Sequence, residues 1–437
     1  MRISVIGTGY LGATHAAAMA ELGHDVLGVD VDDLKIKRLD AGEVPFYEPG
    51  LPELLQRNLA AGRLRFTTSF DQAAAFGDVH FICVGTPQKR GEFSADLTYV
   101  DAAVASLLAV MRPGGVVVGK STVPAGTAAR LAADVEAAGG QLVWNPEFLR
   151  EGFAVQDTLR PDRIVMGGPP EAVEVLQEVY APITENSETP CIVTDYATAE
   201  LVKVAANSFL ATKISFINAM AEVCEVTGGD VVELAAALSH DARIGGRFLH
   251  AGLGFGGGCL PKDIRAFMAR AGELGVDQAL TFLKEIDAIN MRRRSRMVDL
   301  ARELCDGSLA GVRVGVLGAA FKPNSDDIRD SPALDVAVAV QRAGAAVRVY
   351  DPQAMQNARR DFPTLAYVPD APSAVADADL VLHLTEWPEF RQMHPSTLGE
   401  VVREKRIVDG RNALDSELWR ANGWTYRALG RPVAPAA

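Results

Sequence analysis

The segment RISVIGTGYLG, residues 2–12, combines a short apolar run with the glycine spacing G-x-G-x-x-G, formed by Gly7, Gly9 and Gly12. An Ala-rich stretch follows at residues 13–22. In a dinucleotide-binding turn, the first glycine permits the tight turn, the second lets the backbone approach a pyrophosphate, and the third lets the helix pack on the strand. The order strand, turn, helix predicts an α/β Rossmann-type fold with phosphates at the helix N-terminus.

A second apolar run, residues 25–29, ends in Asp30. This carboxylate falls about 20 residues beyond the glycines, where an acidic residue accepts a hydrogen bond from the ribose 2′-hydroxyl. It would also repel a 2′-phosphate, so we predict NAD rather than NADP as the cofactor. The alternative is a glycine turn with an incidental aspartate, which the complete strand–helix–strand pattern disfavours.

Composition narrows the class of protein. With 437 residues the chain should hold two or three domains, and 48% hydrophobic with 23% charged residues is ordinary for a soluble globular enzyme. A net charge of −13 argues against nucleic acid as a partner. No apolar run approaches membrane-spanning length, so no membrane partner is expected. Five scattered cysteines without C-x-x-C spacing predict no metal site and a reducing, cytoplasmic location.

Three further β-branched runs in the N-terminal half end in polar residues; they are residues 78–84, 115–120 and 141–144. In an open parallel sheet the ligand lies outside the carboxyl ends of the strands. We therefore expect Thr86, Thr122 and Glu147 to meet at one crevice. The alternative is that Thr-Pro and Asn-Pro are only turn signals.

The alternation of strands and helices starts again near residue 311 and predicts a second Rossmann-like half. Its first turn, residues 318–323, lacks the spaced glycines, so we expect it to serve the substrate rather than the cofactor. Residues 194–302 between the two halves read as mainly helical. The run Arg292–Arg294 within them is expected to form a solvent-exposed face.

Two places in the helical region suggest chemistry. Lys203 and Asn207 lie one helical turn apart and could donate together to an alkoxide oxygen. The alternative, a solvated lysine beside an indifferent asparagine, is disfavoured by apolar neighbours that leave little of this helix to water. Cys259 follows three glycines in GFGGGCLPKD, residues 254–263, and a helix starting at Pro261 with Lys262 nearby would favour its thiolate. Such a thiol can trap an aldehyde and carry it to a thioester, whereas a lone cysteine is usually an inert core residue.

The chain resembles the UDP-glucose/GDP-mannose dehydrogenase family over nearly its whole length. The motifs that carry the resemblance are residues 7–12, 84–87, 121–124, 145–152, Lys203 with Asn207, the loop through Cys259 to Asp263, residues 321–323 and residues 409–411. The resemblance implies oxidation of a nucleotide-sugar C6 hydroxyl to a carboxylate with two NAD per turnover. It also implies two doubly wound Rossmann-like domains joined by a long central helix that builds a homodimer or higher homo-oligomer.

The implied domains are an NAD-binding Rossmann domain at 1–195, a central helical dimerisation domain with the cysteine loop at 196–302, and a UDP-sugar-binding Rossmann-like domain at 303–430. Residues 431–437 are expected to form a disordered tail.

The resemblance also implies the catalytic roles. Cys259 would be the nucleophile, and Lys203 with Asn207 would steady the oxyanion, Lys203 also taking a proton. Glu147 would be the base for thioester hydrolysis, with Thr122 and Asp263 holding a water.

The implied cofactor contacts are Gly7, Gly9, Tyr10, Leu11, Gly12, Asp30, Lys35, Thr86, Thr122, Glu151, Lys262 and Arg329. The implied substrate contacts are Glu147, Phe148, Leu149, Arg150, Glu151, Lys203, Asn207, Arg243, Phe248, Leu249, His250, Ala251, Gly252, Gly256, Lys322 and Arg411. The family's counterpart of Arg243 reaches across the dimer. For Arg329 and Arg411 a surface salt bridge is the alternative.

Three functions stay open at this point. The first is NAD-dependent oxidation of UDP-glucose to UDP-glucuronate. The second is the same chemistry on GDP-mannose or a UDP-N-acetylhexosamine. The third is a non-catalytic NAD-binding regulator, which the intact set of Cys259, Lys203, Asn207 and Glu147 disfavours.

Overall fold

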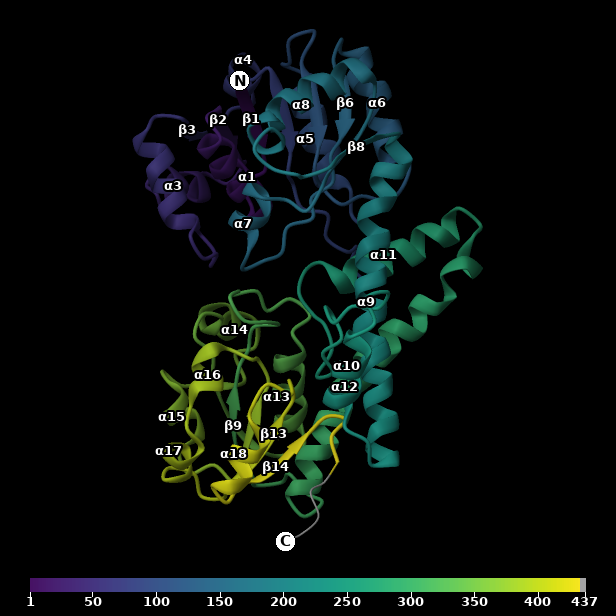
Figure 1. Ribbon diagram of the computed structural model, residues 1–437. Helices are drawn as coiled ribbons and strands as arrows, with labels where there is room; N and C mark the ends of the chain where they lie inside the picture. Colours follow the sequence, from purple (N-terminus) through teal and green to yellow (C-terminus); the bar gives the residue numbers. More distant parts are fainter. Residues whose placement is uncertain (433–437) are drawn as a thin grey trace. The chain divides into compact units, whose positions relative to one another are not determined.

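The computed structural model describes residues 1–432. These residues form two compact units (Figure 1). Unit 1 comprises Met1–Ala206 and Arg265–Gly275, and unit 2 comprises Asn207–Ile264 and the chain from Val276 onward. Residues 433–437 of the expected tail lie outside the described residues. Arg431 is described, and its guanidinium lies 2.9 Å from the Asp230 carboxylate.

Unit 1 contains an eight-stranded sheet with the order β3-β2-β1-β4-β5-β6-β7-β8. Its strands are β1 (Arg2–Ile6), β2 (Asp25–Val29), β3 (Leu64–Thr67), β4 (Val79–Ile82), β5 (Val116–Gly119), β6 (Gln141–Trp144), β7 (Ile164–Gly167) and β8 (Cys191–Thr194). All neighbouring pairs are parallel except β6 with β7. The first six strands have the order of the dinucleotide-binding fold.

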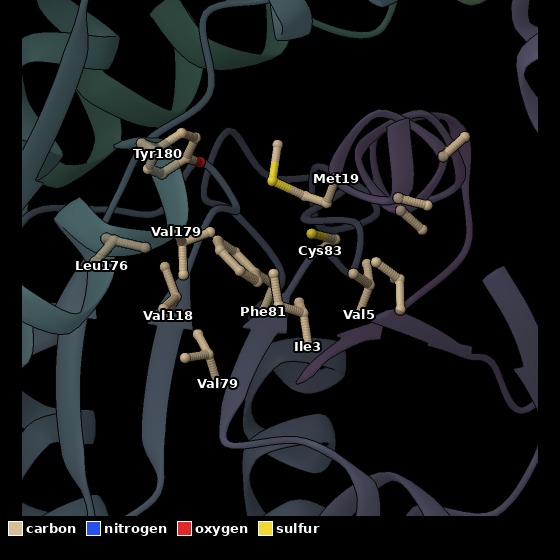
Figure 2. Close-up of a cluster of buried hydrophobic side chains, with 14 of the residues drawn as sticks. Ile3, Val5, Met19, Val79, Phe81, Cys83, Val118, Leu176, Val179 and Tyr180 are labelled. Carbon is tan, nitrogen blue, oxygen red and sulfur yellow. The ribbon is translucent and has the colours of Figure 1, made fainter. Parts of the chain in front are cut away.

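Helices cover both faces of this sheet because its strands are apolar on both sides. One core contains Ile3, Val5 and Phe81 and is covered by α1 (Tyr10–Glu21), α3 (Leu51–Ala60) and α8 (Pro170–Thr184). Figure 2 shows this core, with Met19 and Leu176 reaching it from the helices. The other core contains Ile6 and Ile82 and is covered by α4 (Phe70–Phe76), α5 (Thr98–Leu108) and α6 (Thr127–Ala137). Unit 1 also contains α2 (Asp33–Asp40) and α7 (Ala154–Leu159).

Unit 2 contains a six-stranded parallel sheet with the order β11-β10-β9-β12-β13-β14. Its strands are β9 (Arg313–Leu317), β10 (Ala346–Tyr350), β11 (Ala366–Tyr367), β12 (Leu380–His383), β13 (Arg406–Asp409) and β14 (Thr425–Ala428). The order repeats that of the first six strands of unit 1, which confirms the prediction of two Rossmann-like sheets. Its helices are α13 (Pro332–Arg342), α14 (Met355–Asp361), α15 (Ala371–Val375), α16 (Pro388–Gln392), α17 (Pro395–Gly399) and α18 (Ser416–Ala421).

The region between the sheets is helical, as predicted. Its elements are α9 (Tyr196–Thr227), α10 (Val231–Ser239), α11 (Leu260–Glu273), the 3₁₀ turn η1 (Asp277–Leu280) and α12 (Thr281–Leu304). Helix α9 is 32 residues long. Within residues 1–432, none of the helices combines the length and the apolar character needed to cross a membrane.

Two expectations about helix surfaces are wrong. Arg293 and Arg294 are buried rather than solvated, because three consecutive helical residues are spread over more than half the circumference and cannot share one face. Arg293 lies 3.5 Å from Glu225, and Arg294 lies 2.8 Å from Asp330. Helix α9, conversely, exposes apolar side chains: Phe209 is 66% exposed, and Leu201, Phe216, Val223 and Val226 are exposed as well.

Candidate functional site

The three glycines of the first turn have different physical roles. Gly7 has φ +89°, which favours glycine, and a Cβ there would lie 2.7 Å from the Val84 side chain. A Cβ on Gly12 would collide with the carbonyl oxygen of Gly7. Gly9 has nothing within 4 Å of such an atom, and no side chain caps the helix that Tyr10 and Leu11 begin. The N-terminus of α1 is therefore open to an anion, as a pyrophosphate requires.

Asp30 ends β2 and is held as a carboxylate beside this turn. One oxygen accepts hydrogen bonds from the Thr8 backbone at 2.8 Å and from Lys35 Nζ at 2.8 Å, and the other accepts from the Asp32 backbone at 3.1 Å. Burial alone would raise the pKa of Asp30, but the hydrogen bonds from Lys35 and the backbone outweigh it and lower the pKa. Asp30 and Lys35, both predicted cofactor contacts, are thus an ion pair.

Thr86, Thr122 and Glu147 follow three adjacent parallel strands, β4, β5 and β6. The Thr86 hydroxyl donates to the Thr122 carbonyl at 2.8 Å. Glu147 Oε1 accepts from the backbone N–H groups of Phe148 at 2.8 Å and Leu149 at 3.0 Å. The carboxylate of Glu147 is therefore fixed by the backbone of the segment it begins.

Lys120 is a residue that the sequence reasoning missed. Its Nζ lies 3.0 Å from Glu147 Oε2 and donates to Asn145 at 2.9 Å and to the Tyr180 hydroxyl at 3.1 Å. Burial alone would lower the pKa of Lys120, but the charge of Glu147 and the Tyr180 hydroxyl raise it. A lysine directly after the wholly buried run Val116–Gly119 was the available signal, since a charge seldom ends such a strand without a partner.

The segment after Glu147 is also held in place. The ring of Phe148 lies 5.5 Å from Lys203 Nζ and 3.9 Å from the Arg163 guanidinium carbon, so two cations share one aromatic side chain. Arg150 is exposed and pairs with Asp157 at 2.6 Å. Glu151 is buried.

Glu48 connects the end of the segment that follows Glu147 to the start of α1, which the glycine turn precedes. Its carboxylate accepts from the backbone of Gly152 and Ala154, both at 2.7 Å, and from the hydroxyl of Tyr10. Burial raises the pKa of Glu48 above its usual range, although these hydrogen bonds oppose the effect. Glu48 carries no motif of its own, so sequence reasoning did not single it out.

In unit 2, Cys259 is exposed and directly precedes α11, which begins at Leu260. Asp263 is buried one turn further on and accepts from Asn207 Nδ2 and from Lys262 Nζ, each at 2.6 Å. Four predicted residues, Cys259, Lys262, Asp263 and Asn207, are thus brought together by the start of α11 and by α9. Lys203 lies one turn before Asn207 in α9.

The glycines before Cys259 allow close packing against residues 321–331. Gly257 has φ +82°, and a Cβ there would lie 2.7 Å from the Phe321 ring. A Cβ on Gly258 would collide with the guanidinium of Arg329, and one on Gly256 with the Asp330 carbonyl. Arg329, a predicted cofactor contact, lies 2.7 Å from Asp327 and is exposed. Glycine is therefore required at Gly256, which meets backbone, and at Gly257, which has a positive φ, whereas Gly258 meets only the flexible end of Arg329.

Two buried asparagines hold the loop Phe248–Gly256, and neither was predicted. Asn218 accepts from the Gly252 backbone at 2.9 Å. Asn290 accepts from the Phe255 N–H at 2.7 Å and donates to the Phe255 carbonyl at 3.0 Å, as a neighbouring strand would. Within the loop, Leu249, Ala251 and Gly252 are buried, His250 is exposed, and Phe248 has φ +67°.

The three predicted substrate cations of unit 2 differ in their surroundings. Arg411 donates to the carbonyls of Leu384 at 2.7 Å, Gly254 at 3.0 Å and Phe321 at 3.1 Å, and burial lowers its pKa. Lys322 Nζ lies 5.4 Å from the Phe321 ring centre. The side chain of Arg243 is 90% exposed and pairs with Asp241 at 2.7 Å.

Comparison with known proteins agrees with these features. Three domain descriptions of the UDP-glucose/GDP-mannose dehydrogenase family match the chain: the NAD binding domain at residues 1–184, the central domain at 197–292 and the UDP binding domain at 315–416. A UDP-glucose 6-dehydrogenase of Rhizobium meliloti is 43% identical, covering 99% of this chain and 100% of its own. One of Bacillus subtilis is 40% identical, covering 99% and 94%.

Solved structures agree as well. A UDP-glucose dehydrogenase from Pyrobaculum islandicum has a TM-score of 0.89 at 40% identity, covering 99% of this chain and 98% of its own. A UDP-D-ManNAc dehydrogenase from Pyrococcus horikoshii has a TM-score of 0.86 at 28% identity, with 99% of both chains covered. The open N-terminus of α1 and the Asp30 carboxylate suit NAD. The chain is therefore an NAD-dependent oxidoreductase that belongs to the UDP-glucose/GDP-mannose dehydrogenase family.

Proposed function

We propose that the protein oxidises the C6 hydroxyl of UDP-glucose to a carboxylate, giving UDP-glucuronate. The observation that carries the proposal is the exposed Cys259 at the start of α11, one turn before an Asp263 that binds Asn207. Oxidation of an alcohol only to an aldehyde needs no nucleophilic thiol, whereas a thiolate can trap the aldehyde and carry it on to the acid. Relatives that align over nearly the whole chain are named UDP-glucose 6-dehydrogenases.

The proposed reaction has two oxidations and one hydrolysis. When bound at the turn Gly7–Gly12 and Asp30, NAD would supply the hydride acceptor for each oxidation, so one turnover would consume two NAD. Lys203 takes the proton of the C6 hydroxyl, and Lys203 with Asn207 stabilises the negative oxygen. The Cys259 thiolate adds to the aldehyde carbon, and loss of the second hydride leaves a thioester. Water then attacks the thioester carbonyl, Glu147 accepts the water proton, and the Cys259 thiolate leaves; Thr122 and Asp263 are assigned to hold that water.

The proposed cofactor and substrate contacts are the sets named under Sequence analysis. For the cofactor, the ion pair of Asp30 with Lys35 and the uncapped turn at Gly9 support this assignment. For the substrate, the cations Lys322, Arg243 and Arg411 have the charge that a diphosphate requires. Arg411 supports the proposal least directly, because its donors already bind backbone carbonyls.

A second candidate keeps the chemistry and changes the sugar to a UDP-N-acetylhexosamine or GDP-mannose. The likeness to the Pyrococcus horikoshii UDP-D-ManNAc dehydrogenase supports it. The lower identity, 28% against 40%, favours UDP-glucose.

We also propose that the protein works in the cytoplasm as a homodimer or higher homo-oligomer. The five cysteines all lie within residues 1–432 and form no disulfide bond there, as a reducing compartment would keep them. The apolar side chains exposed along α9 give a face that a second copy could cover.

The first experiment is to count NADH formed per UDP-glucose consumed, with the sugar limiting. A ratio of about two supports oxidation to the acid. A ratio of about one would mean that the reaction stops at the aldehyde. Turnover of GDP-mannose or a UDP-N-acetylhexosamine in place of UDP-glucose would favour the second candidate, and NAD binding without turnover of any sugar would indicate a regulator.

A further inference from the structure

We propose that Lys120 is a positioning residue that holds the Glu147 carboxylate in the orientation needed for thioester hydrolysis. The inference rests on the function proposed above, in which Glu147 is the base. Lys120 is 3% exposed and follows β5, whereas Glu147 follows β6, the next strand of the sheet. The ion pair therefore joins the carboxyl ends of two adjacent strands.

The hydrogen bonds of Glu147 leave its carboxylate little freedom. Two carboxylate oxygens offer about four acceptor sites. The backbone of Phe148 and Leu149 occupies two of them on Oε1, and Lys120 occupies one on Oε2. An attacking water would bind the remaining acceptor site on Oε2. The position of Lys120 Nζ therefore determines where on Glu147 that water can bind.

Lys120 is itself fixed by three acceptors. Its ammonium group has three N–H donors, and Glu147, Asn145 and Tyr180 lie 3.0, 2.9 and 3.1 Å from Nζ. The Tyr180 hydroxyl donates to Asn145 Oδ1 at 2.7 Å, and Asn145 Nδ2 donates to the Val165 carbonyl at 2.8 Å. Asn145 and Tyr180 are buried, so this network is held by the core of unit 1.

Stability alone gives a weak reason for this arrangement. Removing two ions from water is costly, and a buried ion pair is often no more stabilising than apolar residues of the same volume. A pair with one fully buried cation and one carboxylate at a strand end is better explained by orientation of that carboxylate. The side chain of Glu147 retains 17% exposure, which allows it to meet a water.

The decisive variant is Lys120→Met, which keeps the length and apolar stem and removes the charge. We expect the first-turnover burst of NADH to stay within about twofold of the wild type, while steady-state turnover falls about 10- to 100-fold, the loss typical of a misplaced catalytic group. We also expect the thioester on Cys259 to accumulate, detected by intact-protein mass after acid quench. A purely structural defect would slow the burst and the steady state together, and that result would overturn the proposal.

Three further variants make the result unambiguous. Glu147→Gln must accumulate the same thioester; if it does not, the base assigned in the proposed function is wrong, and the role of Lys120 fails with it. If Glu147→Gln accumulates thioester and Lys120→Met does not, only the role of Lys120 is overturned. Tyr180→Phe keeps the Lys120 charge and loosens its support, so we expect a milder accumulation, and this variant decides the matter if Lys120→Met does not fold.

Tyr196→Phe is the matched control. The Tyr196 hydroxyl donates to the Leu142 carbonyl at 2.8 Å, so the variant also removes one tyrosine hydroxyl bond in unit 1 without touching Lys120. It should accumulate no thioester, and accumulation in this variant would show that any loss of packing in unit 1 has the same effect.

Discussion

Asn207 and Asp263 form a 2.6 Å hydrogen bond between α9 and the start of α11, and the Asp263 carboxylate is buried. The other carboxylate oxygen accepts from Lys262 at 2.6 Å. Asp263 therefore fixes two side chains near Cys259, which it follows by one helical turn.

We expect Asp263→Asn to lower turnover by about 100-fold. The amide nitrogen of the new asparagine would face one of the present donors, Asn207 or Lys262, and leave that donor without an acceptor. Turnover is measured as NADH formation from UDP-glucose. Asp263→Asn loses the hydrogen bond to Asn207, which should lower the melting temperature. Adding Asn207→Asp restores this bond with donor and acceptor exchanged, so the melting temperature of the double variant should recover. Unchanged turnover in Asp263→Asn would contradict the assigned role.

Cys259→Ser should abolish formation of the acid while leaving NAD and UDP-glucose binding intact, because a serine hydroxyl is a far weaker nucleophile than a thiolate. The NADH yield per UDP-glucose should then fall from about two to about one or less. Cys191→Ser is the control, because burial raises the pKa of Cys191 and keeps that thiol protonated. Full activity in Cys259→Ser would contradict a thioester intermediate.

Asp30→Ala should reduce the preference for NAD over NADP. The variant removes the carboxylate that would repel a 2′-phosphate. It also leaves the Lys35 ammonium, which lies 2.8 Å from Asp30 in the wild type, without that partner and able to attract the phosphate. The test is the ratio of kcat/KM for the two cofactors. Adding Lys35→Ala should abolish the gain in NADP use, whereas an unchanged ratio in Asp30→Ala would contradict the role of Asp30 as discriminator.

The glycine turn could be predicted because its geometry is local. Gly7, Gly9 and Gly12 lie within six consecutive residues, and their spacing indicates the role of each glycine. The sheet order followed from the alternation of strands and helices. The partners of Lys120 could not be predicted, because Tyr180 lies 60 residues from it in sequence and no periodicity links the two. The burial of Arg293 was missed for a similar reason, since its partners Glu222 and Glu225 lie on another helix, α9.

The apolar face of α9 should be an assembly surface. Phe216 lies on this face and is 47% exposed. A charge placed at position 216 would be buried without a partner in any interface formed there. We expect Phe216→Glu to dissociate the oligomer, seen by sedimentation velocity, and to lower turnover if Arg243 acts in the partner's site. Leu418→Glu is the control, being 39% exposed on α18. A wild type that sediments as a monomer would contradict this prediction at once.

Acid should destabilise unit 1 through its buried histidines. Burial lowers the pKa of His80 to about 4 from an ordinary value of 6.5, and His15 and His24 are shifted in the same direction. The unfolded chain therefore binds protons at a higher pH than the folded chain, so stability is complete above pH 6.5 and declines as the pH falls toward 4. For His80 alone the loss would be about 3 kcal/mol at pH 4. His80→Gln, which has no charge to gain, should show a smaller decline of the unfolding free energy in urea titrations between pH 6.5 and pH 4. Equal declines in the two proteins would mean that His80 is protonated in the folded state, despite its 2.6 Å contact with Ser4 in the core of the sheet.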